Sequence, residues 1–183
     1  FANVAPEAGY RGITGFVVER EMAGFSVGKK EDKLGIRASS PCELILEGVR
    51  VPKANILGVV GEGYKVAIET LNEGRIGIGA QSIGIAGGAI EAAINYANER
   101  QQFGRPISEF QGLQWKFAEM KMQLDAARLL LYRAASNADR GFPDAGETAI
   151  AKAYCNETGF SVASDAMQVM GGAGYSQDSL VEI

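Results

Sequence analysis

The sequence predicts an α+β fold in which a β-rich segment, residues 1–57, precedes a helical bundle over residues 58–183. Two observations support this prediction. Up to about residue 57, short runs of β-branched and aromatic residues are bounded by glycine and proline. From residue 61 onward, the apolar residues recur with a helical period instead of alternating.

Three stretches of the first segment predict strands: GITGFVVER, GFSVGKK and CELILEGVRVP. In the last of them, we expect the alternation to turn Cys42, Leu44 and Leu46 toward a core and to leave Glu43 and Glu47 outside. So few short strands bury too little surface to fold alone. We therefore expect the sheet to continue upstream of Phe1, and the chain to be a piece of a longer protein.

Three long helices are predicted after residue 61. The first, to about residue 99, is apolar on most faces, as is typical of a buried helix. The second ends near Gly141, and the third runs from about Asp144 to the pair Gly171–Gly172. The apolar residues of the second helix follow a 4-3-4-3-4 spacing that fits an up-down bundle: Leu113, Phe117, Met120, Leu124, Ala127 and Leu131.

Glycine is frequent inside the first of these helices. Each interior glycine costs a helix about 1 kcal/mol relative to alanine. So many of them predict close contact with another backbone or with a ligand. The glycines are Gly74, Gly77, Gly79, Gly84, Gly87 and Gly88.

Composition excludes several classes of function. A net charge of −4 and a pI near 5.0 argue against general nucleic-acid binding. No apolar run reaches the roughly 18 residues of a membrane span. The absence of histidine from the sequence removes histidine-based triads and most zinc sites. Cys42 and Cys155 are predicted to be reduced thiols.

The segment ERQQFGRPISEFQ, residues 99–111, interrupts the helices with two arginines and two aromatic rings. A plain helix–helix connection is usually shorter. A flat, anionic ligand would suit this combination of guanidinium groups and rings.

Other candidate motifs also have plain structural interpretations. GGAGY, residues 171–175, neither follows a strand nor opens a helix, so a nucleotide-binding loop is rejected in favour of a helix C-cap. Gln168 lies one turn earlier and could reach a ligand. LNEGR, residues 71–75, is either a packing glycine with an ion pair or the wall of a narrow channel. Tyr10 and Tyr64 could be ordinary half-buried tyrosines.

Taken together, GYKVAIETLNEGRIGIGAQSIGIA, ERQQFGRPISEFQ and QVMGGAGY resemble the acyl-CoA dehydrogenase family, and the resemblance covers essentially the whole chain. KLGIRAS with LNEGRIGIGAQ is most similar to its short/branched-chain members, with short-chain members close behind. The resemblance implies a middle β-domain, barrel- or sandwich-like, that ends within residues 1–57. It also implies a C-terminal up-down helical bundle, incomplete at its end, over residues 58–183. Family members use FAD to introduce a 2,3-double bond into acyl-CoA thioesters.

The same resemblance implies cofactor contacts. The segment from Arg100 to Gln111 would reach the FAD of a neighbouring protomer, so the protein would be a homo-oligomer, most often a tetramer in this family. Arg100 would face the pyrophosphate, Phe103 would pack beside the adenosine, and Gln111 would add a hydrogen bond. The segment that approaches the same FAD comprises Gln168, Val169, Met170, Gly171 and Gly172.

Substrate contacts follow from the resemblance too. They are Tyr10, Tyr64, Asn72, Glu73, Gly74 and Arg75. In some members the base that removes the α-proton directly precedes the helix arginine, a position held here by Gly74. Glu73 is offset from it by about 100° around the helix. We therefore expect no catalytic residue in this chain, and a base beyond Ile183.

Alternatives remain open at this point. An acyl-CoA oxidase shares the fold, and a non-catalytic relative could keep the bundle for assembly or binding. A purely structural bundle would tolerate substitution of Arg100 and Gln168 without loss of flavin. The resemblance further implies electron-transferring flavoprotein as redox partner, a role in fatty acid or branched-chain amino acid breakdown, and a location in the mitochondrial matrix or the bacterial cytoplasm. The acyl-chain preference is not predicted.

Overall fold

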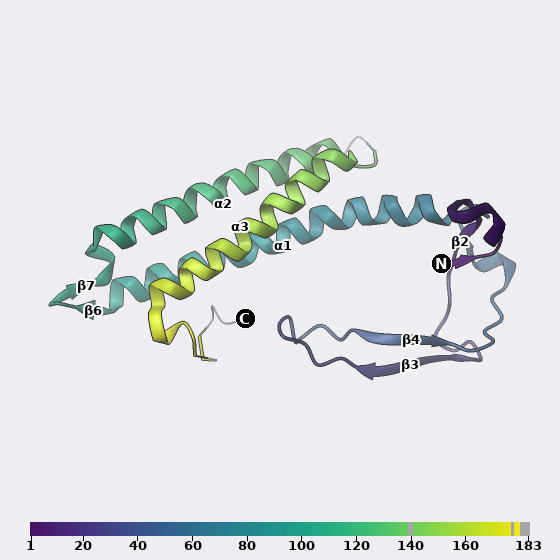
Figure 1. Ribbon diagram of the computed structural model, residues 1–183, viewed down its shortest axis with the longest axis horizontal. Helices are drawn as coiled ribbons and strands as arrows, with labels where there is room; N and C mark the ends of the chain where they lie inside the picture. Colours follow the sequence, from purple (N-terminus) through teal and green to yellow (C-terminus); the bar gives the residue numbers. More distant parts are fainter. Residues whose placement is uncertain (139–140, 177, 180–183) are drawn as a thin grey trace. The chain divides into compact units, whose positions relative to one another are not determined.

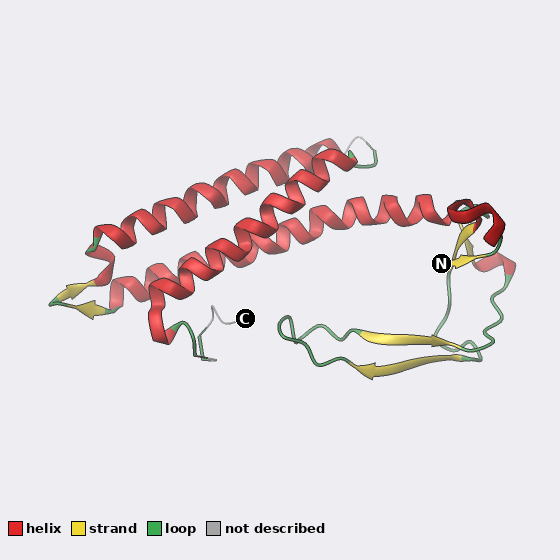
Figure 2. Ribbon diagram, viewed as in Figure 1, coloured by secondary structure: helices red, strands yellow, loops and turns green. Residues whose placement is uncertain are grey.

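The computed structural model describes residues 1–138, 141–176, 178 and 179, and the chain divides into two compact units, Phe1–Thr70 and Leu71–Ile183. Figure 1 shows the course of the chain, and Figure 2 its helices and strands. The end of the chain, on which the expectation of an incomplete bundle rests, includes residue 177 and residues 180–183, outside the described residues.

The first unit contains a small antiparallel sheet in the order β1-β2-β5. Its strands are β1 (Ala2–Asn3), β2 (Ile13–Phe16) and β5 (Ile56–Leu57), joined by the short 3-10 helices η1 (Pro6–Gly12) and η2 (Lys53–Asn55). Thr14 is fully buried, and its hydroxyl oxygen accepts a hydrogen bond of 3.0 Å from the amide of Gly61. This bond holds the segment just before the first long helix against the sheet.

A separate antiparallel ribbon pairs β3 (Phe25–Lys30) with β4 (Cys42–Leu46), which confirms both predicted strands. The expectation that Leu44 and Leu46 face a core is wrong for the chain as described, because they are 59% and 56% exposed. The two leucines lie opposite Val27 and Phe25, so the apolar residues do share one face. A two-stranded ribbon is a single layer, and nothing in its own unit covers that face.

The second unit is built on three long helices, of which α1 begins within the first unit. They are α1 (Gly63–Glu99), α2 (Gln111–Ala138) and α3 (Ala145–Met170). Between α1 and α2 lie β6 (Gln101–Gln102), β7 (Arg105–Pro106) and η3 (Ile107–Glu109), and η4 (Gly171–Ala173) follows α3. Successive helices run in opposite directions (Figure 1), which confirms the predicted up-down arrangement.

The start of α3 agrees with the prediction near Asp144. The Asp144 carboxylate accepts a hydrogen bond of 2.8 Å from the amide of Glu147, which caps the helix. The second helix ends at Ala138, shortly before the predicted Gly141. The sequence therefore predicted both helix limits within a few residues.

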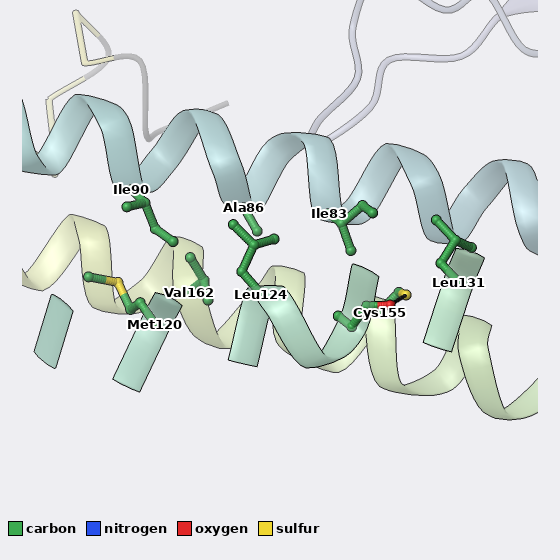
Figure 3. Packing of buried hydrophobic residues seen from close by; sticks show 9 residues of the cluster. Ile83, Ala86, Ile90, Met120, Leu124, Leu131, Cys155 and Val162 are labelled. Atoms are coloured by element: carbon green, nitrogen blue, oxygen red, sulfur yellow. Dashed lines mark hydrogen bonds between the residues drawn. The ribbon is translucent and has the colours of Figure 1, made fainter. Parts of the chain in front are cut away.

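The core lies where the three helices meet (Figure 3). Ile83 and Ile90 of α1 point toward Leu124 and Leu131 of α2, and Val162 of α3 completes the cluster. The 4-3-4-3-4 spacing predicted for α2 is confirmed: Met120, Leu124, Ala127 and Leu131 are buried, and Leu113 and Phe117 pack against the core from its edge.

The expectation of a buried helix holds for one face of α1 only. Most of its buried residues form one stripe with a similar spacing, Gly79, Ile83, Ala86, Ile90, Ala93 and Ala97. Ile78, Ile85 and Ile94 on other faces are 46%, 51% and 39% exposed. Two neighbouring helices can cover only one side of a third, which leaves the remaining apolar surface open.

The predicted close contacts of the α1 glycines hold at some positions only. A Cβ built on Gly79 would lie 2.9 Å from Cδ1 of Leu131, so α1 approaches α2 closely there. On α3, a Cβ on Gly159 would lie 3.1 Å from the carbonyl oxygen of Ser82. A Cβ built on any of four other α1 glycines would meet only open space within 4 Å: Gly74, Gly77, Gly84 and Gly88.

Among the described residues, α1 is the one helix whose length and composition would suffice to cross a membrane. The most apolar 18-residue window of α1 has a mean hydropathy of 1.2, and 33% of that window is buried. Core helices of bundles pass the same test.

The two compact units divide inside α1, after Thr70. The domain boundary at 57/58 stays a prediction. The first turns of α1 belong with the β-rich unit, because Gly61, two residues before α1, is hydrogen-bonded to Thr14.

Candidate functional site

The interruption at residues 99–111 is a short β-hairpin followed by a 3-10 turn. Gln101 pairs with Pro106, and Gln102 pairs with Arg105. The amide of Ile107 donates a hydrogen bond of 2.9 Å to the carbonyl oxygen of Arg100. The hairpin therefore closes directly on the last residue before it, and it holds Arg100 at the end of α1.

The tip of this hairpin consists of Phe103 and Gly104, with φ values of 53° and 78°. Positive φ at both central residues is the signature of a type I′ turn, which favours asparagine followed by glycine. A phenylalanine is strained there, and its ring is 93% exposed. Strain of this kind persists where the surrounding structure imposes it, and it is concentrated at functional sites.

The returning strand of the hairpin is braced by stacked side chains. The guanidinium carbon of Arg105 lies 4.3 Å from the centre of the Phe110 ring, and Arg105 also pairs with Glu109 at 4.0 Å. Phe103 and Phe110 meet edge to face, with ring centres 6.2 Å apart. These contacts link the hairpin tip to the residues just before α2.

The end of α3 supplies the glycine pair. Gly171 has φ 59° and ψ −136°, and its amide donates to the carbonyl oxygen of Gln168. This is a helix C-cap, as the structural interpretation of GGAGY predicted. Its backbone conformation is one that residues other than glycine rarely adopt. No atom lies within 4 Å of a Cβ built on Gly171 or Gly172, so a ligand could approach both.

The structure brings Arg100 together with the end of α3. They line a hollow of about 450 Å³, whose walls are Tyr96, Arg100, Gln102, Ile107, Val169, Met170, Gly171, Gly172 and Ala173. Gln168 lines an adjacent hollow of about 370 Å³ together with Ser164, Met167, Gly171, Gly172 and Tyr175. Six of the eight predicted cofactor residues thus lie on two hollows that share the glycine pair.

The remaining two, Phe103 and Gln111, line neither hollow. Phe103 projects from the hairpin tip, and Gln111 is the exposed first residue of α2. Nothing in the described part of the chain covers either side chain.

The electrostatics of the first hollow depend on Arg100. It is the one charged residue among the lining residues. Its side chain is exposed and makes no hydrogen bond or ion pair with any residue that the structure describes. The C-terminal ends of α1 and α3 both meet at this hollow, and helix C-termini carry partial negative charge. These partial charges oppose an anion, so an anion could bind in this hollow only with the help of the positive charge of Arg100.

The predicted substrate residues fall in both units. In the first unit, the rings of Tyr10 and Tyr64 lie 5.3 Å apart at 55°, and the Arg11 guanidinium carbon is 5.6 Å from the Tyr10 ring centre. In the second unit, the Arg75 guanidinium donates to the amide oxygen of the buried Asn72. The arginine of LNEGR therefore has a neutral partner in this chain.

Glu73 and Gly74 are exposed on α1. That Glu73 is not the base remains a prediction. Among the residues that the structure describes, no group of histidine, cysteine, aspartate and glutamate could hold a metal ion.

Sequence reasoning missed several lining residues. Gln102 and Ile107 lie within the 99–111 segment and Ala173 within GGAGY, but none of them was given a role of its own, and Tyr96 lies in no motif that marks it. Tyr96 lies one turn before Arg100, a spacing that places two residues on one helix face and that could have identified it.

Comparisons with known proteins were made for the whole chain. A family model described as "Acyl-CoA dehydrogenase, C-terminal domain" matches residues 61–183. The chain is 50% identical to the "Short/branched chain specific acyl-CoA dehydrogenase, mitochondrial" of Rattus norvegicus, over 100% of this chain and 42% of that protein.

Solved structures give the same result. The butyryl-CoA dehydrogenase of Megasphaera elsdenii matches with a TM-score of 0.96 and 44% identity, over 98% of this chain and 47% of that one. A chain described under "Electron transferring flavoprotein of Acidaminococcus fermentans" matches with a TM-score of 0.97 and 46% identity, over 99% and 48%. The chain thus spans less than half the length of each of these relatives.

Proposed function

Because the chain belongs to the acyl-CoA dehydrogenase family, we propose that it forms part of an FAD-dependent enzyme that converts short or branched-chain acyl-CoA thioesters to 2-enoyl-CoA. Members of this family are flavoproteins. The proposal rests on the hollow that Arg100 lines together with Gly171 and Gly172. In this proposal, residues 1–57 complete a middle β-domain, and residues 58–183 form most of the C-terminal bundle.

The residues of the hollow suit a dinucleotide. A pyrophosphate carries several anionic oxygens on two linked phosphate groups, which a guanidinium binds with paired hydrogen bonds. Arg100 is free to make them, and the glycine pair leaves room for the ligand. Val169 and Met170 add apolar wall, and Gln168 an amide, from the last turn of α3. When bound, FAD supplies the hydride acceptor.

Phe103 and Gln111 fit a cofactor held partly by a second protomer. Both side chains are exposed, so they can contact the adenosine and add a hydrogen bond across an interface. An exposed apolar stripe at seven-residue spacing on α2 supports a homo-oligomer, here proposed to be a tetramer. It consists of Trp115, Met122 and Leu129, which are 65%, 65% and 70% exposed.

The substrate residues carry over as a proposal. Tyr10 and Tyr64 present exposed rings to an acyl-CoA, and Asn72 to Arg75 present an exposed carboxylate, an open glycine and a polar pair beside the thioester chain. The base that removes the α-proton lies outside this chain in our proposal. Hydrogen bonds to the thioester carbonyl would acidify that proton.

Partner and location follow the relatives. Electron-transferring flavoprotein is the proposed acceptor of the electrons. The mitochondrial matrix is the proposed location if the source is eukaryotic, as for the rat relative, and the bacterial cytoplasm if it is a bacterium.

The test uses the protein expressed from its complete coding sequence and held without oxygen. Addition of 2-methylbutyryl-CoA, butyryl-CoA or isovaleryl-CoA is expected to bleach the flavin absorbance, most rapidly with the preferred chain. A protein without flavin, or with flavin that none of the three reduces, would contradict the proposal. Rapid reoxidation of the reduced flavin by oxygen would identify an oxidase instead.

A further inference from the structure

The end of α3 that carries the glycine pair is tied to α2 by one ion pair. Nζ of Lys116 lies 2.5 Å from Oδ1 of Asp165. Both side chains are about 30% exposed, 31% for the lysine and 30% for the aspartate. Both partners are charged, so the contact is a charge-assisted hydrogen bond, and partial burial reduces its screening by the solvent.

Both partners lie close to the proposed cofactor site along their helices. Asp165 precedes Gln168 by one turn, and Gly171 by about 9 Å of helix rise. Lys116 follows Gln111, the first residue of α2, by about 7.5 Å. The pair thus connects the two segments that present predicted cofactor residues.

The apolar packing at this end of the bundle combines small and large side chains. The buried residues of this cluster are Ala89, Ala93, Ala97, Ile107, Ala166 and Val169, and larger residues such as Leu113 and Phe117 pack against them. Apolar contact is non-directional. The Lys116–Asp165 bond joins one atom of α2 to one atom of α3, so it constrains how the two helices align in a way that apolar contact does not.

We propose that Lys116 and Asp165 are positioning residues that set the axial register of the end of α3, and thereby place Gly171 and Gly172 beside Arg100. This inference rests on the proposed function, because it assumes that the hollow binds FAD. Neither residue touches the hollow itself.

A second ion pair between the same helices provides a matched control. Nε of Arg133 lies 3.5 Å from Oε1 of Glu147, near the opposite ends of α2 and α3. Position 133 is about 25 Å along α2 from position 116. Loss of this pair should loosen the bundle without displacing the glycine pair.

The experiment measures the FAD dissociation constant and the visible flavin spectrum of the protein expressed from its complete coding sequence. Lys116→Met and Asp165→Asn are each expected to raise the dissociation constant three- to tenfold. The dissociation constant of the double variant should be no higher than that of the weaker-binding single variant, since either change alone breaks the pair. Lys116→Arg should restore most of the affinity, and Arg133→Met should stay within twofold of the unmodified protein.

Changes in FAD affinity of opposite sign in the two single variants would overturn the inference. If the pair acted only through its charge on an anionic ligand, Lys116→Met would weaken FAD binding and Asp165→Asn would strengthen it. Unchanged affinity in both variants would also overturn it. Should Lys116→Met fail to fold, Asp165→Asn, which preserves side-chain size, decides the question alone.

Arg100→Ala separates this inference from the proposed function. If Arg100→Ala releases FAD while the Lys116 and Asp165 variants retain it, the ion pair is purely structural and the proposed site stands. If Arg100→Ala also leaves FAD binding unchanged, the proposed site itself is wrong.

Discussion

The guanidinium carbon of Arg105 lies 4.3 Å from the centre of the Phe110 ring. The two residues flank η3, so this contact ties the returning strand of the hairpin to the start of α2. Arg105 also pairs with Glu109, and Phe110 meets Phe103 edge to face. One stacked arginine therefore connects the returning strand to Phe110, which in turn contacts the exposed tip.

Removal of this stacking should loosen the hairpin. Arg105→Ala loses a cation–π contact worth about 0.5–1 kcal/mol at an exposed position. We expect the Ile107 amide, which bonds to Arg100, to exchange with solvent about two- to fivefold faster by hydrogen-exchange mass spectrometry. The exchange rate in Arg105→Lys should lie between those of the unmodified protein and of Arg105→Ala. An unchanged exchange rate in the alanine variant would show that the stacking does not brace the hairpin.

Phe103→Asn should separate stability from binding. Asparagine followed by glycine suits the type I′ turn that Phe103 strains. The variant should therefore gain up to about 1 kcal/mol in the free energy of unfolding. It should also bind FAD more weakly, because the exposed ring is lost. Chemical denaturation and flavin titration measure the two effects. A variant that loses stability, or gains affinity, would contradict this assignment of the strain.

The two glycines after α3 should respond differently to alanine. Gly171 holds φ 59° and ψ −136°, so Gly171→Ala should cost about 1–3 kcal/mol of folding free energy. Gly172 has no positive φ and open space around a built Cβ, so Gly172→Ala should change stability by less than about 0.5 kcal/mol. It should still weaken FAD binding by crowding the hollow. Equal stability losses would refute the backbone argument.

The two cysteines should differ in reactivity. Burial raises the pKa of the Cys155 thiol above its usual value of 9.0, and its Sγ lies 3.5 Å from the carbonyl oxygen of Ala127. Iodoacetamide should therefore modify the partly exposed Cys42 first, and Cys155 only on unfolding. Peptide mass mapping after brief labelling at pH 8 would show the order.

The same shift predicts a pH dependence of stability. The folded state holds the Cys155 proton to higher pH than the unfolded state does. The protonated Cys155 thiol therefore makes its full contribution to the free energy of unfolding below the unfolded pKa near 9.0. This contribution declines as the pH rises toward the folded pKa. Cys155→Ser would remove this dependence, and an unchanged alkaline slope in that variant would contradict it.

Much of the fold could be predicted from the sequence. The helix limits follow from local signals such as the Asp144 cap and the glycine pair after α3, and the α2 core follows from a clear period. The failures concern faces that nothing in the chain covers. Leu44 and Leu46 alternate correctly yet lie exposed, and α1 is apolar on most faces yet is buried mainly along one stripe. Sequence pattern reports which surface is apolar, not what covers it.

The candidate site was predicted only in part. The resemblance identified Arg100 and the segment from Gln168 to Gly172, and the structure brings these residues to two adjoining hollows. The positive φ at Phe103 had no signal in the sequence, because turn statistics favour asparagine there. The Lys116–Asp165 pair is separated by 49 residues and depends on how two helices align, which local patterns do not specify.

The affinity of the Arg100→Ala variant for FAD tests the central claim most directly. Charge-assisted hydrogen bonds contribute about 1.5–3 kcal/mol, so the FAD dissociation constant should rise about ten- to a hundredfold. Folding stability without FAD should stay the same, because Arg100 makes no side-chain bond within the described chain. A variant that keeps its full flavin content and affinity would contradict the assignment of this hollow as the cofactor site.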